Sequence, residues 1–159
     1  FRILKQNIRK NAMKNIELFN AGLSDIRGRV PFFKHGGGSG ITEVEDAEQI
    51  EVEMVTLDRI IGTAGIPGPV HVINMDCEGS ELNVLKGGMD VLKKDHPAIF
   101  CEVHSKYLRQ LGQSVEDILD FLKNLNYWVK PIQVEDLNRE TTYAECSHVY
   151  ACFTYFQER

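Results

Sequence analysis

Two apolar segments in the middle of the chain define its most regular part. Val70–Met75 and Ala98–Val103 show almost no polar alternation, which is typical of strands covered on both faces in a parallel sheet. Between them, Ser80–Lys86 and Met89–Lys94 have helical character and are separated by Gly87-Gly88. A connection of this length suits a crossover helix, so the pattern predicts a strand–helix–strand unit.

The amino-terminal third mixes one helix with short strands. Phe1–Asn11 is predicted as a helix whose apolar side chains share a face, and Ile16–Asn20 as a short buried strand. Ala21–Asp25 would form the loop at the carboxyl end of that strand. Val30–Phe33 and Glu51–Thr56 are predicted to pair as strands.

The last third returns to the alternation of helix and strand. Ser114 and Asp117 have the spacing of a capping box, and the helical apolar repeat that follows comprises Val115, Ile118, Leu119 and Leu122. Tyr127–Ile132 and Val149–Phe156 are strand candidates. The chain is therefore interpreted as one α/β domain over residues 1–159, doubly wound and without internal repeats.

Composition narrows the class of protein. The 159 residues carry 18 Lys+Arg against 23 Asp+Glu, a formal net charge of −5, which argues against a nucleic-acid binder. No apolar run approaches the roughly 18 residues of a membrane span. Because Cys77, Cys101, Cys146 and Cys152 show no C-x-x-C spacing, we expect reduced thiols and a cytoplasmic location.

Candidate chemistry gathers where the two central strands end. Asp76, Glu78 and Glu81 follow the first, and Glu102 and His104 close the second. In open α/β sheets, ligands bind at the carboxyl ends of strands. An alternative interpretation is that Glu78 and Glu81 only complement the positive end of the following helix. Glu102 and His104 point to the same side of a strand and form either an acid/base pair or a structural hydrogen-bonded pair.

Several catalytic motifs do not occur in the sequence. There is no G-x-S-x-G elbow, no phosphate-binding loop of the G-x-x-x-x-G-K-[ST] type and no G-x-G-x-x-G fingerprint. An oxygen-rich metal site from the five residues of the strand ends is chemically feasible. Its spacing matches no specific ligand pattern, and no metal ligand is assigned from the sequence.

Taken together, four motifs resemble the FkbM-type S-adenosylmethionine-dependent methyltransferases. They are Val55-Thr56-Leu57-Asp58, the string from Ile73 to Glu81 that contains D-x-E-G-x-E, Val84-Leu85-Lys86-Gly87-Gly88, and Pro97 to His104 with its E-x-H. Asn20-Ala21-Gly22-Leu23-Ser24-Asp25 is also similar to that family. The resemblance implies a Rossmann-like class I sheet whose last strand is antiparallel, and transfer of a methyl group from S-adenosylmethionine to a hydroxyl.

The resemblance also implies roles for individual residues. Asn20 and Ala21 would lie near the adenine of the cofactor, and Asp76 at the junction of cofactor and acceptor. Glu102 and His104 would face the acceptor hydroxyl, with His104 as the preferred base, oriented by Glu102, and Asp76 as the alternative base. Glu78 and Glu81 are assigned to substrate binding. The glycine-rich connection Gly36–Gly40 would cover the pocket.

The same resemblance implies that the first two strands of the sheet, with the glycine-rich cofactor loop, belong before Phe1. The strand Val70–Met75 would then have an unpaired apolar edge, and this chain alone would bind the cofactor weakly or not at all. The acceptor is expected to be a small molecule, a saccharide or lipid-like, and a homo-oligomer is possible. Two other functions stay open: a non-catalytic module that self-associates through a sheet edge, and a metal-dependent hydrolase using Asp76, Glu78, Glu102 and His104.

Overall fold

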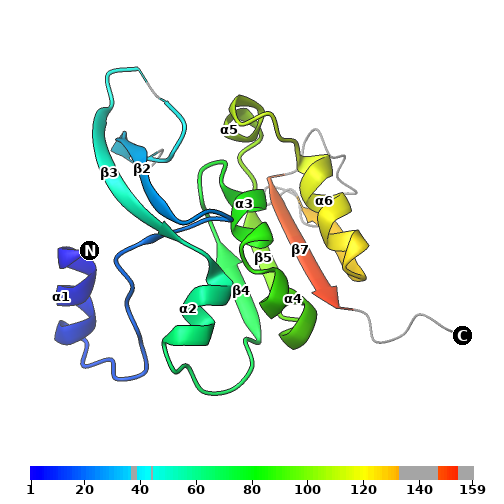
Figure 1. Ribbon diagram of the computed structural model, residues 1–159, viewed down its shortest axis with the longest axis horizontal. Helices are drawn as coiled ribbons and strands as arrows, with labels where there is room; N and C mark the ends of the chain where they lie inside the picture. The colour runs from blue at the N-terminus through cyan, green and yellow to red at the C-terminus, as the bar shows by residue number, and fades with distance from the viewer. Residues whose placement is uncertain (37–38, 44, 133–146, 154–159) are drawn as a thin grey trace, which may run out of the picture.

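The protein folds as two sheets connected by short helices (Figure 1). The computed structural model describes residues 1–36, 39–43, 45–132 and 147–153. In chain order the elements are α1 (Arg2–Lys10), β1 (Gly22–Leu23), β2 (Gly28–Lys34), β3 (Glu48–Val55), α2 (Leu57–Thr63), β4 (Val72–Met75), α3 (Glu81–Lys86), α4 (Met89–Asp95), β5 (Ala98–Glu102), α5 (Ser105–Gln110), α6 (Val115–Asn124), β6 (Tyr127–Ile132) and β7 (His148–Phe153).

The larger sheet has the order β4-β5-β7-β6. β4 is parallel to β5, whereas β7 runs antiparallel to both β5 and β6. This confirms the mixed α/β fold with an antiparallel last strand. Because Met75 pairs with Cys101, β4 and β5 end side by side, and the polar residues that follow them meet at one edge.

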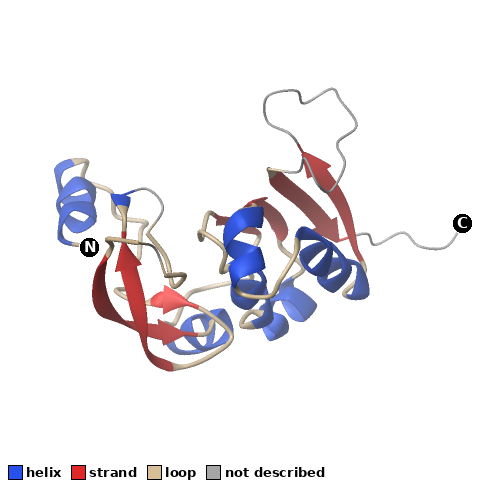
Figure 2. Ribbon diagram, turned by 90° about the horizontal axis from the view of Figure 1, so that it is seen from above, coloured by secondary structure: helices blue, strands red, loops and turns tan. Residues whose placement is uncertain are grey.

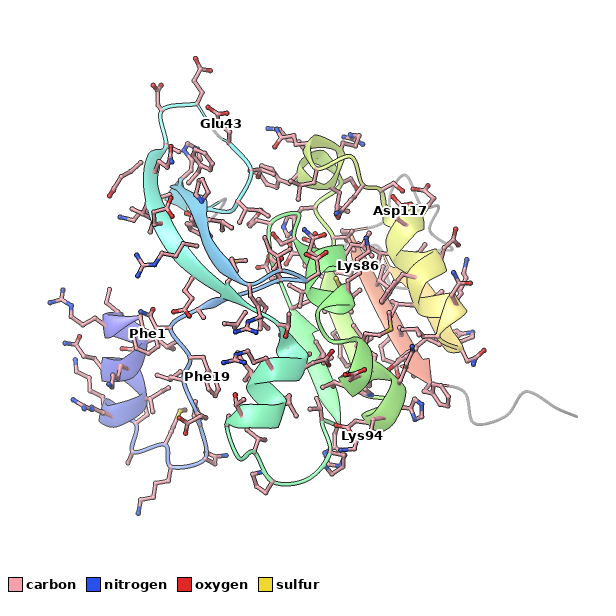
Figure 3. All side chains as sticks on the ribbon, viewed as in Figure 1. Phe1, Phe19, Glu43, Lys86, Lys94 and Asp117 are labelled. Atoms are coloured by element: carbon pink, nitrogen blue, oxygen red, sulfur yellow. The ribbon has the colours of Figure 1, made fainter. Side chains whose placement is uncertain are left out.

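Helices α3, α4 and α6 cover one face of this sheet (Figure 2). Their buried side chains and the inward residues of the strands form the core, which includes Leu85, Leu92, Ile99, Cys101, Ile118, Leu119, Leu122, Val149 and Ala151. The capping box of α6 is confirmed. The Ser114 amide donates to the Asp117 carboxylate at 2.8 Å, and the Asp117 amide donates to Ser114 Oγ at 3.2 Å, at the end of α6 labelled in Figure 3.

The opposite face of the larger sheet is open in the described residues. Val72, Phe100 and Trp128 are 55%, 48% and 48% exposed, and Tyr150 lies between the rings of Phe100 and Trp128. The prediction that Val70–Met75 is covered on both faces is therefore wrong. The helices that pack on the described sheet bury only Ile73 and Met75 of β4, which is also an edge strand.

The smaller sheet has the order β1-β3-β2. The predicted pairing of the two strands is confirmed, with β2 antiparallel to β3 from Gly28–Met54 to Lys34–Glu48. The predicted strand Ile16–Asn20 is wrong. Ile16 and Phe19 are 42% and 41% exposed, and no described strand pairs with this segment, so its backbone has no ladder to join. The strand forms instead at Gly22–Leu23, inside the expected loop, parallel to Met54–Val55.

Two helices, α1 and α5, bury few or none of their residues. α1 matches the prediction but buries none of its residues and lies at the periphery (Figure 3). α5 was not predicted, because its six residues are too few to show a helical repeat and only Leu108 is buried.

The last residues of the predicted strand Val149–Phe156, and Cys146, lie outside the described residues. In the described part of the chain, no helix is long and apolar enough to cross a membrane.

A junction of closely packed backbone joins the two sheets at the break between α3 and α4. The Gly87 Cα approaches the Ser24 carbonyl so closely that an added Cβ would collide with its oxygen. Next to it, the Asp58 amide donates to the Gly87 carbonyl at 3.1 Å, and the Asp58 carboxylate accepts from the amides of Asp90 and Val91 at 3.1 and 2.9 Å. The side chain of Asp58 therefore satisfies the first turn of α4.

This junction predicts that Gly87→Ala is strongly destabilising. The new methyl group meets backbone atoms, which cannot rotate away, and we expect a loss of about 2 kcal/mol or more in the free energy of unfolding. Gly62→Ala is the matched control, because Gly62 lies in α2 with nothing within 4 Å of its added Cβ. It should leave stability unchanged or raise it by up to about 1 kcal/mol. Urea unfolding measures both, and equal midpoints for the two variants would contradict the close contact.

Candidate active site

His104 lies at the centre of the polar cluster formed by the ends of β4 and β5. Its Nδ1 is 2.9 Å from Glu81 Oε1. Its Nε2 faces three further carboxylates, with Glu78 Oε2 at 3.5 Å and Asp76 Oδ1 and Glu102 Oε1 each at 3.6 Å. The structure thus brings together all five of the residues that the sequence places at the two strand ends.

The turn between β4 and α3 directs the carboxylates that follow β4 towards the His104 ring. Gly79 has φ +95°, and a Cβ there would meet Tyr107 Cβ at 2.5 Å, so only glycine suits this position. Glu78, also at positive φ (+46°), completes the reversal. The Gly79 amide donates to Glu81 Oε1 at 3.0 Å, so that one buried oxygen holds both the turn and the imidazole.

Glu81 is fully buried, with 0% exposure, and its Oε2 has no hydrogen-bond partner among the described residues. The substrate contact expected for Glu81 needs exposed surface, which this side chain lacks, and its Oε1 contacts His104 Nδ1 instead. Glu102, which was expected to orient the ring, lies beyond hydrogen-bond distance of Nε2. It also lies 3.8 Å from His148 Nε2, a neighbour that the sequence analysis missed because the pairing depends on the register of β5 and β7.

The charges of the cluster shift the pKa values of its members. Burial lowers the pKa of His104, but the hydrogen bond to Glu81 and the charges of Glu78, Glu81 and Asp76 outweigh it and raise the pKa overall. Burial raises the pKa of Glu78, against the opposing effect of His104. Burial and the charge of Glu81 raise the pKa of the Cys77 thiol to about 12, which makes it a poor nucleophile.

A cavity of about 300 Å³ opens beside the cluster, between the two sheets. Leu23, Phe32 and Met54 supply apolar lining, and Asp76 and Glu78 supply charge. Ser39 and Gly40 also line it, as expected for a connection that covers the pocket, while Gly37 and Gly38 lie outside the described residues. Glu102 and His104 are not among its lining residues.

Asn20 and Ala21 are not part of this cavity. They line a neighbouring one of about 520 Å³, between α1 and β3. Gly22 and Phe32 line both cavities, so the two lie next to each other.

Comparison with known proteins identifies the family. The model of the methyltransferase FkbM domain matches residues 8–129, which is more than three quarters of the chain. The chain belongs to the FkbM methyltransferase family. A crystal structure of methyltransferase FkbM from Methylobacillus flagellatus KT is similar to this FkbM chain, with a TM-score of 0.57 and 20% sequence identity.

The match with the Methylobacillus structure covers 94% of this FkbM chain but only 33% of that protein. At this level of identity the likeness establishes the fold alone. The chain therefore spans about a third of the solved relative. No curated protein matches the chain.

The contact between Glu81 and His104 predicts the tautomer of the neutral ring. Because Nδ1 faces a carboxylate oxygen at 2.9 Å, it should carry the proton and leave the Nε2 lone pair open to the cluster. Two-bond ¹H–¹⁵N spectra at alkaline pH should show His104 as the Nδ1–H form, with exposed His71 as the internal reference in the Nε2–H form.

Glu81→Leu removes the acceptor and should return His104 to the Nε2–H form. The variant also removes the partner of the Gly79 amide, so its fold is checked by the dispersion of the same spectra. A wild-type His104 in the Nε2–H form would contradict the hydrogen bond to Glu81.

Proposed function

We propose that this FkbM-family chain takes part in methyl transfer from S-adenosylmethionine to a hydroxyl oxygen of a small-molecule, saccharide or lipid-like acceptor. The observation that carries the proposal is the His104 ring, held at Nδ1 by a buried carboxylate, with Nε2 directed towards Asp76 and Glu78, which line the cavity. A base for a hydroxyl proton needs this combination of a fixed ring and an accessible lone pair.

The residues present suit a cationic methyl donor. The cavity of about 300 Å³ falls at the lower end of small-molecule pockets, and its apolar lining suits the uncharged parts of such a ligand. Asp76, with a side chain 60% exposed, and Glu78 place negative charge at the rim, which favours a sulfonium. When bound, S-adenosylmethionine supplies an electrophilic methyl group on that sulfonium.

Each residue of the site has a proposed role that follows from its position. His104 accepts the hydroxyl proton at Nε2, and Glu81 stabilises the resulting imidazolium through Nδ1. Asp76 and Glu102 flank the acceptor oxygen and hold it in line, while Glu78 contacts the acceptor. We assign Asn20 and Ala21 to the adenine end of the donor, in the neighbouring cavity.

His104→Ala should test this proposal in the purified protein. With S-adenosylmethionine labelled at the methyl group and a panel of hydroxylated acceptors, we expect turnover to fall by about 100-fold or more, because a positioned base typically contributes that much. The Kd for S-adenosylmethionine, measured by calorimetry, should stay within about threefold, because the ring acts on the acceptor.

The matched control is His71→Ala, since His71 is exposed at the opposite end of β4 and should leave both values unchanged. An unchanged rate in His104→Ala would remove His104 from the mechanism. Measurable binding of S-adenosylmethionine without label transfer to any class of acceptor would overturn the proposed function.

A further inference from the structure

We propose that Asp76, Glu102 and His104 bind one divalent transition-metal cation, of the class of Mn²⁺ or Zn²⁺. The three side chains each offer a ligand atom, and these atoms all lie within 4.8 Å of one another. They come from the ends of two adjacent parallel strands, so the backbone hydrogen bonds between β4 and β5 fix their spacing.

The distances from Nε2 to the Asp76 and Glu102 oxygens suit ligands of one ion. At 3.6 Å, Asp76 Oδ1 and Glu102 Oε1 are too far from Nε2 for hydrogen bonds. Two ligands that each lie about 2.1 Å from a tetrahedral metal are separated by about 3.4 Å, close to the observed spacing. Nε2 also has the right chemistry, because the ring proton belongs on Nδ1 and leaves a lone pair at Nε2.

The second observation is the buried carboxylate behind the ring. Histidine ligands of metals regularly donate their other N–H to a carboxylate, which fixes the ring and raises its basicity. Glu81 meets this description, with Oε1 at 2.9 Å from Nδ1 and a side chain that is 0% exposed. Its Oε2 is buried and has no partner in the described part of the chain.

The negative charge of the cluster also favours a bound cation. Asp76, Glu78, Glu81 and Glu102 gather around a single imidazole, and no lysine or arginine of the described residues forms an ion pair with any of them. Two of these carboxylates, Glu78 and Glu81, have side chains only 18% and 0% exposed, and burying carboxylates without compensation is costly. A site with one nitrogen and two oxygen ligands suits a transition metal better than Mg²⁺ or Ca²⁺, which prefer oxygen alone.

This inference concerns binding and does not rest on the proposed methyl transfer. A bound cation occupies the Nε2 lone pair, so His104 as a ligand and His104 as a base are alternative states of one site. Asp76 and Glu102 have side chains 60% and 44% exposed, which leaves the site open to water or to a further ligand.

The test is calorimetric titration of the purified protein with MnCl₂ after removal of metals by a chelator. We expect one site with a micromolar Kd, weakened at least tenfold by His104→Ala and by Glu102→Gln. Glu81→Gln removes the charge behind the ring and should weaken binding by about 10- to 100-fold. The matched control is Glu51→Gln, an exposed carboxylate on β3, which should leave the Kd unchanged.

Paramagnetic broadening in the wild-type protein makes the test independent of how the variants fold. At substoichiometric Mn²⁺, the His104 ring signals should broaden before those of exposed His71. Millimolar binding, an unchanged Kd in folded His104→Ala, or equal broadening of the two rings would overturn the site. Methyl transfer without Mn²⁺ binding would refute this inference alone, whereas Mn²⁺ binding without methyl transfer would refute only the proposed function.

Discussion

The hydrogen bond between Glu81 and His104 is the interaction on which the polar end of the larger sheet depends. It connects the first turn of α3 to His104, two residues after the end of β5, and the same oxygen accepts a hydrogen bond from the Gly79 amide. Without it, the turn after β4 and the imidazole would each lose a fixed partner inside the protein. The other carboxylates reach the ring only at longer distances, so their arrangement follows from this one contact.

Parallel pairing of β4 and β5 is the constraint that makes such a cluster possible. Because the two strands end in register, acidic residues from segments more than 20 positions apart converge on one ring. The smaller sheet then closes the cavity from the other side with apolar groups such as Phe32 and Met54. Charge lies on one wall and apolar surface on the other, an arrangement that suits a ligand with a cationic centre and an uncharged body.

The sequence predicted correctly those elements that are specified by residues close together in the chain. The capping box at Ser114 depends on neighbouring residues alone, and the apolar runs of β4 and β5 were sufficient to predict two parallel strands, although not their exposed face. The segment Ile16–Asn20 failed because a strand needs a partner, and none of the described strands supplies one. Glu81 was misassigned for a similar reason. Its burial depends on the tertiary packing of α3, which no spacing near Glu81 reveals.

The junction at Gly87 has a dynamic consequence for the cavity. Opening the molecule as a hinge between the two sheets would break three hydrogen bonds of Asp58, each contributing about 1 kcal/mol, and separate Ser24 from the backbone of Gly87. Separation of the two sheets as rigid bodies is therefore an unfavourable way for a ligand to reach the cavity. The rim of the cavity is fixed as well, because Gly40, which lines it, is held to β2 by two backbone hydrogen bonds with Phe33, at 2.8 and 3.1 Å.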